Sequence, residues 1–97
     1  MSVRASGFAT CDKGERYIKQ LTSHWSHKFP TSFAEDIGTV QFSDTDQAHM
    51  AVAPDGIAIT LTTADAETNL RLREVIEKHL DRFAFREGAL VYDWTEK

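Results

Sequence analysis

The amino-acid sequence predicts an α+β fold, a two-layer sandwich in which two helices cover one face of a mostly antiparallel sheet. Two segments carry apolar residues at the spacing of an amphipathic helix, and five shorter segments have the composition or the alternation of strands. These elements follow one another in the order β-α-β-β-β-α-β. The 97 residues are the length of one domain, 1–97, with a modest core.

The first predicted strand spans residues 2–10, and the first predicted helix follows it. Asp12 is placed to cap this helix, with Glu15 reaching back in a capping box. Pro30 ends the helix, because proline disfavours helical geometry at the residue before it. The apolar face of the helix consists of Tyr17, Ile18, Leu21 and Trp25.

The middle of the chain predicts three antiparallel strands joined by tight turns. One strand lies within residues 31–42, the next spans 47–53, and the third alternates apolar and polar residues over 57–62. The second turn contains Pro54, which presets φ, and Gly56, which accepts a positive φ. The sheet face away from the helices is expected to carry Gln41, His49, Thr60 and Thr62.

The second predicted helix opens with Thr63 or Asp65 as its cap and ends near Gly88. His79 lies close to the centre of its apolar stripe, so the periodicity predicts that the imidazole is buried. The stripe consists of Leu72, Ile76, His79 and Phe83. A last strand is expected over residues 89–94, with Leu90, Tyr92 and Trp94 on one side.

Composition excludes several classes of protein. The net charge of −4 argues against a general nucleic-acid binder. No segment approaches the roughly 20 apolar residues that span a bilayer. Cys11 is the one cysteine, so no disulfide forms within the chain, which fits a reducing compartment. We expect a cytoplasmic protein and interpret Cys11 as a small, half-buried loop residue.

Three histidines are the first candidate site residues. His24 and His27 lie on the first helix and His79 on the second, so the helices could bring the three imidazoles together. Three imidazoles can bind zinc, copper or iron. The competing interpretation is that His79 is a structural histidine whose ring nitrogen has a partner in the core, because spacing of i, i+3 is a weak metal motif.

Charged residues form the second candidate set. Arg82 and Arg86 are four residues apart near the end of the second helix, where the macrodipole favours cations. Alternatively their guanidinium groups hold an anionic ligand, and Lys28 could join them. Phe85 either packs where the helix unwinds or is exposed. We find no nucleophile beside a base, P-loop or dinucleotide motif, so an enzyme is not expected.

Three sequence pieces together resemble a small bacterial family known as domain of unknown function 2218. They are R-Y-x-K-Q-L at residues 16–21, H-x-x-H-K at 24–28 and H-L-x-R-F-A-F-R-E at 79–87, with Trp94. The resemblance covers nearly the whole chain and implies no established activity. It also implies an accessory role in iron handling, because similar domains can be joined to siderophore-interacting, FAD-dependent ferric reductases.

The leading hypothesis is a non-enzymatic binding or accessory domain without a cofactor. A cleft between the helix ends would bind a small anion or a metal chelate related to iron uptake, and a siderophore-interacting reductase would be a partner. The family-matched positions are His24, His27, Lys28, His79, Arg82, Arg86 and Glu87. The alternatives are a histidine-based metal site and a structural module that forms a homodimer through the open sheet face.

Overall fold

One six-stranded antiparallel sheet and two α-helices make up the computed structural model, which describes residues 2–88 and 90–96. A short 3-10 helix, η1, follows the second α-helix. In chain order the elements are β1 (Val3–Thr10), α1 (Gly14–Trp25), β2 (Thr31–Ala34), β3 (Ile37–Gln41), β4 (Gln47–Ala53), β5 (Gly56–Thr63), α2 (Ala66–Phe83), η1 (Phe85–Glu87) and β6 (Val91–Glu96).

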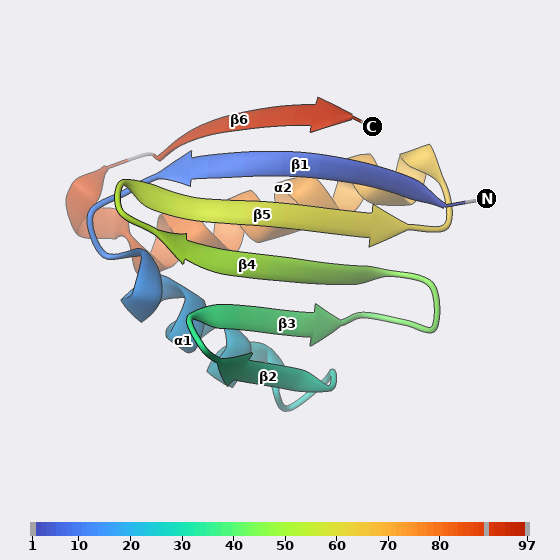
Figure 1. Cartoon of the computed structure of the whole chain (residues 1–97), viewed down its shortest axis with the longest axis horizontal. Coiled ribbons are helices and arrows are strands. Elements are labelled where there is room, and N and C mark those ends of the chain that lie inside the picture. Colours follow the sequence, from blue (N-terminus) through green and yellow to red (C-terminus); the bar gives the residue numbers. More distant parts are fainter. Residues whose placement is uncertain (1, 89, 97) are drawn as a thin grey trace.

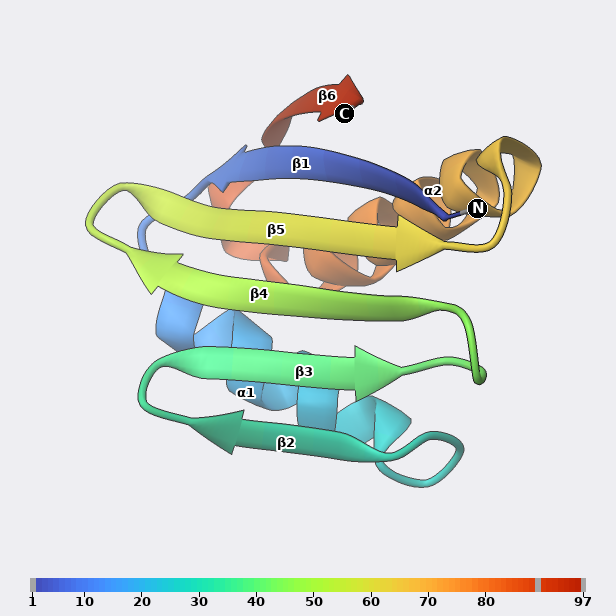
Figure 2. The same ribbon diagram turned by 45° about the vertical axis from the view of Figure 1, so that its right-hand side comes forward.

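The strands lie in the order β2-β3-β4-β5-β1-β6, and each neighbouring pair is antiparallel. β1 therefore lies inside the sheet, between β5 and β6. Both helices cover the same face, α2 behind β1 and β5 and α1 behind β3 and β2 (Figures 1 and 2). This arrangement confirms the predicted α+β class and its two layers. No helix in the described residues is long and apolar enough to cross a membrane.

The core lies between the sheet and the two helices. Ile57, Ile59 and Leu61 of β5 are buried while Ala58 and Thr60 between them are exposed, which confirms the predicted alternation. They meet the buried side chains of the two helices. Burying each large aliphatic side chain stabilises the fold by about 1.5–3 kcal/mol. The helix residues in this core are Tyr17, Ile18, Leu21, Trp25, Ile76 and Leu80.

Two glycines permit close approaches that a side chain would block. A Cβ at Gly38 would lie 2.4 Å from Cγ2 of Ile18, so glycine lets α1 pack directly on β3. A Cβ at Gly56 would lie 2.1 Å from the carbonyl oxygen of Ala9. The predicted positive φ at Gly56 is wrong, because among the described glycines only Gly88 has one, at 78°. Close packing, rather than turn geometry, requires glycine at position 56.

The predicted strand within residues 31–42 is in fact two strands, β2 and β3. They are joined by a two-residue turn in which Glu35 and Asp36 have positive φ values of 52° and 64°. A hairpin of this kind needs positive φ at both turn residues, which asparagine and glycine adopt most readily. The sequence offers two acids instead, so the turn was not predicted, and the described sheet has six strands rather than five.

The predicted ends of α1 are also wrong. Lys13 is the N-cap and its side chain makes no capping hydrogen bond, so Asp12 and Glu15 form no capping box. The helix ends at Trp25, before Pro30, in a turn where the amides of Lys28 and Phe29 donate to the Trp25 carbonyl. The buried face of the helix is as predicted.

Asp65 caps α2 as predicted, since its Oδ1 accepts a hydrogen bond from the Thr68 amide at 2.7 Å. The predicted burial of His79 is wrong, because His79 is only half-buried. The line of α2 that faces the sheet runs through Ile76 and Leu80, which are fully buried. His79 is one helical position away and faces α1, where Trp25 contacts it.

The last strand, β6, begins at Val91. Of the predicted span, Ala89 lies outside the described residues. Leu90 is buried, and Tyr92 and Trp94 pack against the core from the same side, as predicted. Both aromatic side chains are tied to α2: the Tyr92 hydroxyl donates to Oδ1 of Asp81 at 2.8 Å, and the Trp94 indole donates to a carboxylate oxygen of Glu77 at 2.7 Å.

Candidate functional site: two pockets at the ends of the first helix

A cavity of about 540 Å³ lies where the last turn of α1 faces α2. Its wall is mostly aromatic and aliphatic, and its polar groups are three imidazoles and one ammonium. We call it the histidine pocket. It is lined by His24, Trp25, His27, Lys28, Phe29, Phe42, Leu72, Val75 and His79.

The orientation of the His79 ring is set by α2 itself. Nδ1 lies 2.8 Å from the Val75 carbonyl oxygen, one turn earlier. A carbonyl oxygen only accepts hydrogen bonds, so Nδ1 carries a proton. In the neutral imidazole Nε2 then has a lone pair, and His79 can accept a hydrogen bond from a donor in the histidine pocket.

Aromatic contacts hold the rest of this pocket in place. The Trp25 ring is the hub: it lies 4.9 Å from His79 and 5.1 Å from Phe42, measured between ring centroids. Phe29 packs edge-on against Phe42 at 5.1 Å. The His24 ring is 5.3 Å from His79, so the two helices do bring these imidazoles side by side. Edge-to-face pairs of this kind favour one arrangement of the rings.

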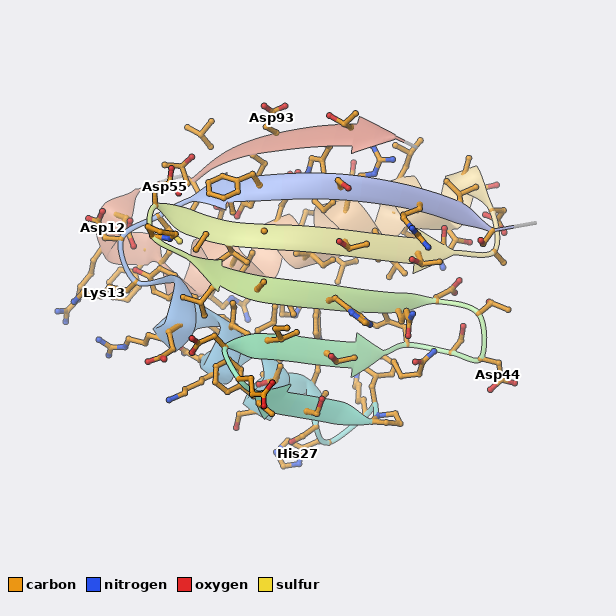
Figure 3. All side chains as sticks on the ribbon, in the orientation of Figure 1. Asp12, Lys13, His27, Asp44, Asp55 and Asp93 are labelled. Carbon is orange, nitrogen blue, oxygen red and sulfur yellow. The ribbon has the colours of Figure 1, made fainter. Side chains whose placement is uncertain are left out.

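The three imidazoles do not form a metal site. Within residues 2–88 and 90–96 there is no group of three or more His, Cys, Asp or Glu side chains that could hold a metal ion. His27 lies beyond the end of α1, and Figure 3 shows its side chain directed outward below β2. His24 and His79 therefore lack the third ligand that a histidine site needs.

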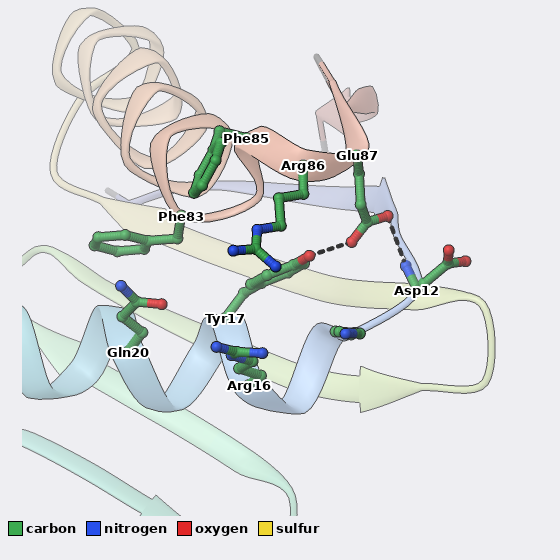
Figure 4. Close-up of a pocket in the computed structure, with 9 residues that line it drawn as sticks. Asp12, Arg16, Tyr17, Gln20, Phe83, Phe85, Arg86 and Glu87 are labelled. Atoms are coloured by element: carbon green, nitrogen blue, oxygen red, sulfur yellow. Dashed lines mark hydrogen bonds between the residues drawn. The ribbon is translucent and has the colours of Figure 1, made fainter.

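A second, smaller cavity of about 240 Å³ lies at the other end of α1, where η1 crosses its first turns (Figure 4). Cationic and aromatic side chains dominate its wall. We call it the arginine pocket. It is lined by Asp12, Lys13, Arg16, Tyr17, Gln20, Phe83, Phe85, Arg86 and Glu87.

Glu87 joins the segments that form this second pocket. Its Oε1 accepts a hydrogen bond from the Asp12 amide at 2.9 Å, and its Oε2 accepts one from the buried Tyr17 hydroxyl. These two donors lower the pKa of the Glu87 carboxyl. Burial, together with the hydrogen bond to Glu87, raises the pKa of Tyr17 to about 12. The carboxylate also places negative charge at the start of α1, where the macrodipole favours it.

Cys11 is buried just before this junction. Burial, and next the nearby Glu87 charge, raise the pKa of its thiol to about 11. Only the thiolate is a strong nucleophile, so Cys11 is an inert residue in the folded protein. The sequence predicted a half-buried loop residue; Cys11 does lie in a loop, but it is buried.

The residues proposed from the sequence therefore divide among separate places. His24, His27, Lys28 and His79 share the histidine pocket, whereas Arg86 and Glu87 line the arginine pocket. Arg82 is exposed and lines neither. Arg86 does not stack on Arg82 along one helix face, because α2 ends at Phe83 and Arg86 belongs to η1. Phe85 is exposed to 70%.

Sequence reasoning missed several residues that line the pockets. Phe29 lies just after α1 and Phe42 just after β3. At these positions no helical or strand periodicity indicates that a side chain lines a pocket. Arg16 and Gln20 lie on the polar side of α1 and become pocket residues only because η1 crosses that side (Figure 4). The four-residue spacing of Arg16 and Gln20 was the available sign that both face one way.

Fold and pockets define a class: a small α+β domain, with two helices on one face of an antiparallel sheet and a cavity at either end of the first helix. A family profile described as an uncharacterised protein conserved in bacteria, DUF2218, matches residues 6–95. The chain belongs to this family, as the sequence pieces indicated.

A solved structure has the same fold. The NMR structure of PA4090 from Pseudomonas aeruginosa is 26% identical in sequence, with a TM-score of 0.77. The match covers 98% of this chain and 96% of that chain. No curated protein matches the chain.

Proposed function

We propose that this chain is a non-enzymatic binding domain, and that its histidine pocket holds a small aromatic anion. The observation that carries the proposal is the pairing of a preset acceptor, His79 Nε2, with an aromatic wall around about 540 Å³. Ligand cavities of roughly 300–1,000 Å³ with apolar walls and a few placed polar groups are typical of small-molecule sites.

The lining residues indicate how the ligand would be oriented. Lys28 carries the formal positive charge of the pocket, and no acid among the described residues lines it, so a carboxylate would lie toward Lys28. A hydroxyl group on the ligand would donate to His79 Nε2. The ring would pack against the aromatic wall formed by Trp25, Phe29 and Phe42, whose faces and edges favour aromatic partners.

The binding test uses tryptophan fluorescence. The chain has two tryptophans, and Trp94→Phe leaves Trp25 in the pocket as the reporter. We expect 2-hydroxybenzoate to quench it saturably, with benzoate weaker because it lacks the hydroxyl donor. His79→Gln and Lys28→Gln should each weaken binding about tenfold. His49→Gln, an exposed histidine on the opposite face of the sheet, is the matched control and should change nothing.

The iron link implied by the family resemblance requires that the anion belong to a ferric chelate. The same fluorescence titration with ferric 2,3-dihydroxybenzoate tests this point. Tighter binding of the chelate than of the free acid supports an accessory role in iron handling. Equal or weaker binding leaves the aromatic anion as the ligand. Absence of saturable quenching by all three compounds contradicts the proposed function.

One observation favours a second function, self-association through the open sheet face. Ile37, Ala51, Ala58 and Phe8 are register partners on four adjacent strands, and they form an apolar row on the face without helices. Ile37 is 43% exposed. Light scattering should then give twice the chain mass of 11.0 kDa. The Ala58→Arg variant should be a monomer and give the mass of one chain. A monomer mass for the unaltered protein contradicts this second proposal.

A further inference from the structure

Two arginines from distant segments open into the arginine pocket with no carboxylate partner. Arg16 lies on the first turns of α1 and Arg86 on η1. Figure 4 shows their side chains on either side of the Tyr17 ring. Neither guanidinium forms an ion pair with a carboxylate of residues 2–88 and 90–96. Two guanidinium groups at one cavity, each with a planar set of donors, can bind the oxygens of an anion supplied from outside.

The nearest carboxylates are engaged elsewhere. Both oxygens of Glu87 already accept hydrogen bonds, from the Tyr17 hydroxyl and the Asp12 amide. The Asp12 carboxylate points away from Arg86 (Figure 4). Three cationic side chains and two acids line the cavity, a local charge of plus one in a chain whose net charge is −4. Glu87 therefore organises the pocket without neutralising its arginines.

An aromatic side chain stands beside the arginines. Phe85 is 70% exposed although it is a large apolar residue, and the Arg86 guanidinium lies 5.7 Å from its ring centroid. The amide of Gln20 adds a neutral hydrogen-bond donor to the wall. An exposed aromatic ring beside the Arg86 guanidinium, at a cavity that Arg16 also lines, suits a ligand that carries both an oxyanion and a ring.

We propose that the arginine pocket is a second binding site, which takes an aryl phosphate monoester. The guanidiniums of Arg16 and Arg86 bind the phosphate oxygens, and the ring packs on Phe85. A phosphate rather than a carboxylate is favoured because Lys13 provides a third cation, which matches a group with a charge near −2. This site is independent of the histidine pocket, at the other end of α1.

The test is a titration of the 15N-labelled protein with phenyl phosphate and with inorganic phosphate, at constant ionic strength in chloride. We expect saturable shifts of the amides around residues 16–20 and 83–87, with a Kd for phenyl phosphate of about 1 mM or below. Inorganic phosphate should bind several-fold more weakly. Amides lining the histidine pocket should not move.

Variants at exposed positions separate the parts of the site. Arg16→Gln and Arg86→Gln should each weaken phenyl phosphate binding about tenfold. Arg82→Gln, an exposed arginine at the end of α2 outside the pocket, is the matched control and should leave the Kd unchanged. Phe85→Ala should remove the advantage of phenyl phosphate over inorganic phosphate.

The contrary outcomes are equally definite. Shifts that do not saturate by about 20 mM would overturn the proposal, as would equal weakening by Arg82→Gln, which would indicate general screening by charge. Saturable binding of inorganic phosphate that Phe85→Ala does not affect, with no preference for phenyl phosphate, overturns the aryl part. The separate fluorescence titration of the histidine pocket is unaffected by any of these results.

Discussion

The hydroxyl of Tyr17 on α1 donates a hydrogen bond to Oε2 of Glu87 on η1, across 70 residues of sequence. The same carboxylate accepts from the Asp12 amide, so one side chain ties η1 to the loop between β1 and α1 and to the helix itself. This contact joins three segments that line the arginine pocket.

Removing either partner should destabilise the protein. Tyr17→Phe and Glu87→Gln should each lower the free energy of unfolding by about 2 kcal/mol, the usual range for a hydrogen bond to a charged group. Because the two residues share one interaction, the double variant should lose less than the sum of the single losses. Urea unfolding measures all three, and strict additivity would show that the residues act separately.

Acid should weaken the hydrogen bond between Tyr17 and Glu87, because it protonates the Glu87 carboxylate. The pKa of Glu87 is lowered in the folded protein, so its contribution to stability is complete above the ordinary glutamate value of 4.5 and is lost as the pH falls below it. Glu87→Gln should therefore flatten the acid side of a plot of unfolding free energy against pH. An acid limb identical in both proteins would contradict the prediction.

Alkali should weaken the same hydrogen bond, because it ionises the Tyr17 hydroxyl. The pKa of Tyr17 is raised to about 12 in the folded protein, so its contribution is complete below the ordinary value of 10.0 and falls as the pH rises from there to about 12. Tyr17→Phe should flatten this alkaline limb. Absorbance of the tyrosinate in the folded and unfolded protein follows the titration directly, and ionisation of Tyr17 near pH 10 in the folded state would refute the prediction.

The two predicted helix caps provide a matched pair of variants. Asp65→Ala removes the acceptor for the Thr68 amide and should lower the Tm by about 5 °C. Asp12→Ala removes a side chain that makes no capping bond and should leave the Tm nearly unchanged, because its backbone amide still donates to Glu87. Thermal unfolding by circular dichroism distinguishes them, and equal losses would mean that Asp12 does cap α1.

Gly38→Ala should cost about 1–3 kcal/mol of stability, because the new methyl group would meet Ile18 Cγ2 at 2.4 Å and Thr22 Cγ2 at 3.1 Å. Ile18→Leu removes the first of these contacts, since leucine has no branch at Cβ. The double variant should therefore recover part of the loss. Urea unfolding of the single and double variants tests this, and no recovery would place the strain in the backbone.

Cys11 should resist alkylation in the folded protein. With a pKa of about 11, its thiolate is a small fraction of the thiol at pH 8, and the side chain is buried as well. We expect iodoacetamide to label Cys11 at least about a hundredfold faster in urea than in buffer. Mass spectrometry of timed samples measures both rates, and similar rates would show that the loop opens readily.

Local patterns predicted most of the fold. Alternation over Ile57, Ile59 and Leu61 identified β5, and Thr63 and Asp65 were the two candidate caps for α2, of which the structure shows Asp65. These features depend on neighbours in sequence. The hairpin at Glu35 and Asp36 was missed because the pair lacks the glycine typical of such turns and glutamate seldom adopts a positive φ. Pairing with β4 stabilises the turn through the hydrogen bond from the Val52 amide to the Asp36 carbonyl.

The candidate sites were less predictable because they depend on how the helices face one another. The sequence indicated that His24 and His79 would be neighbours, and their rings are 5.3 Å apart. It did not indicate that α2 would end before Arg86, which places that arginine opposite Arg16 instead of beside Arg82. Helical periodicity assumes that the helix continues, and it carries no information once the chain unwinds.

The place of β1 inside the sheet sets the order of events during synthesis. Gly7 pairs with Ile59 on one side and with Trp94 on the other, so β1 completes its pairing only after both β5 and β6 have been synthesised. The hairpins from β2 to β5 are local and can close while translation continues. Until β1 docks, β5 has an unpaired edge, the kind of strand that pairs with other chains. Docking of β1 therefore removes an edge that could lead to aggregation.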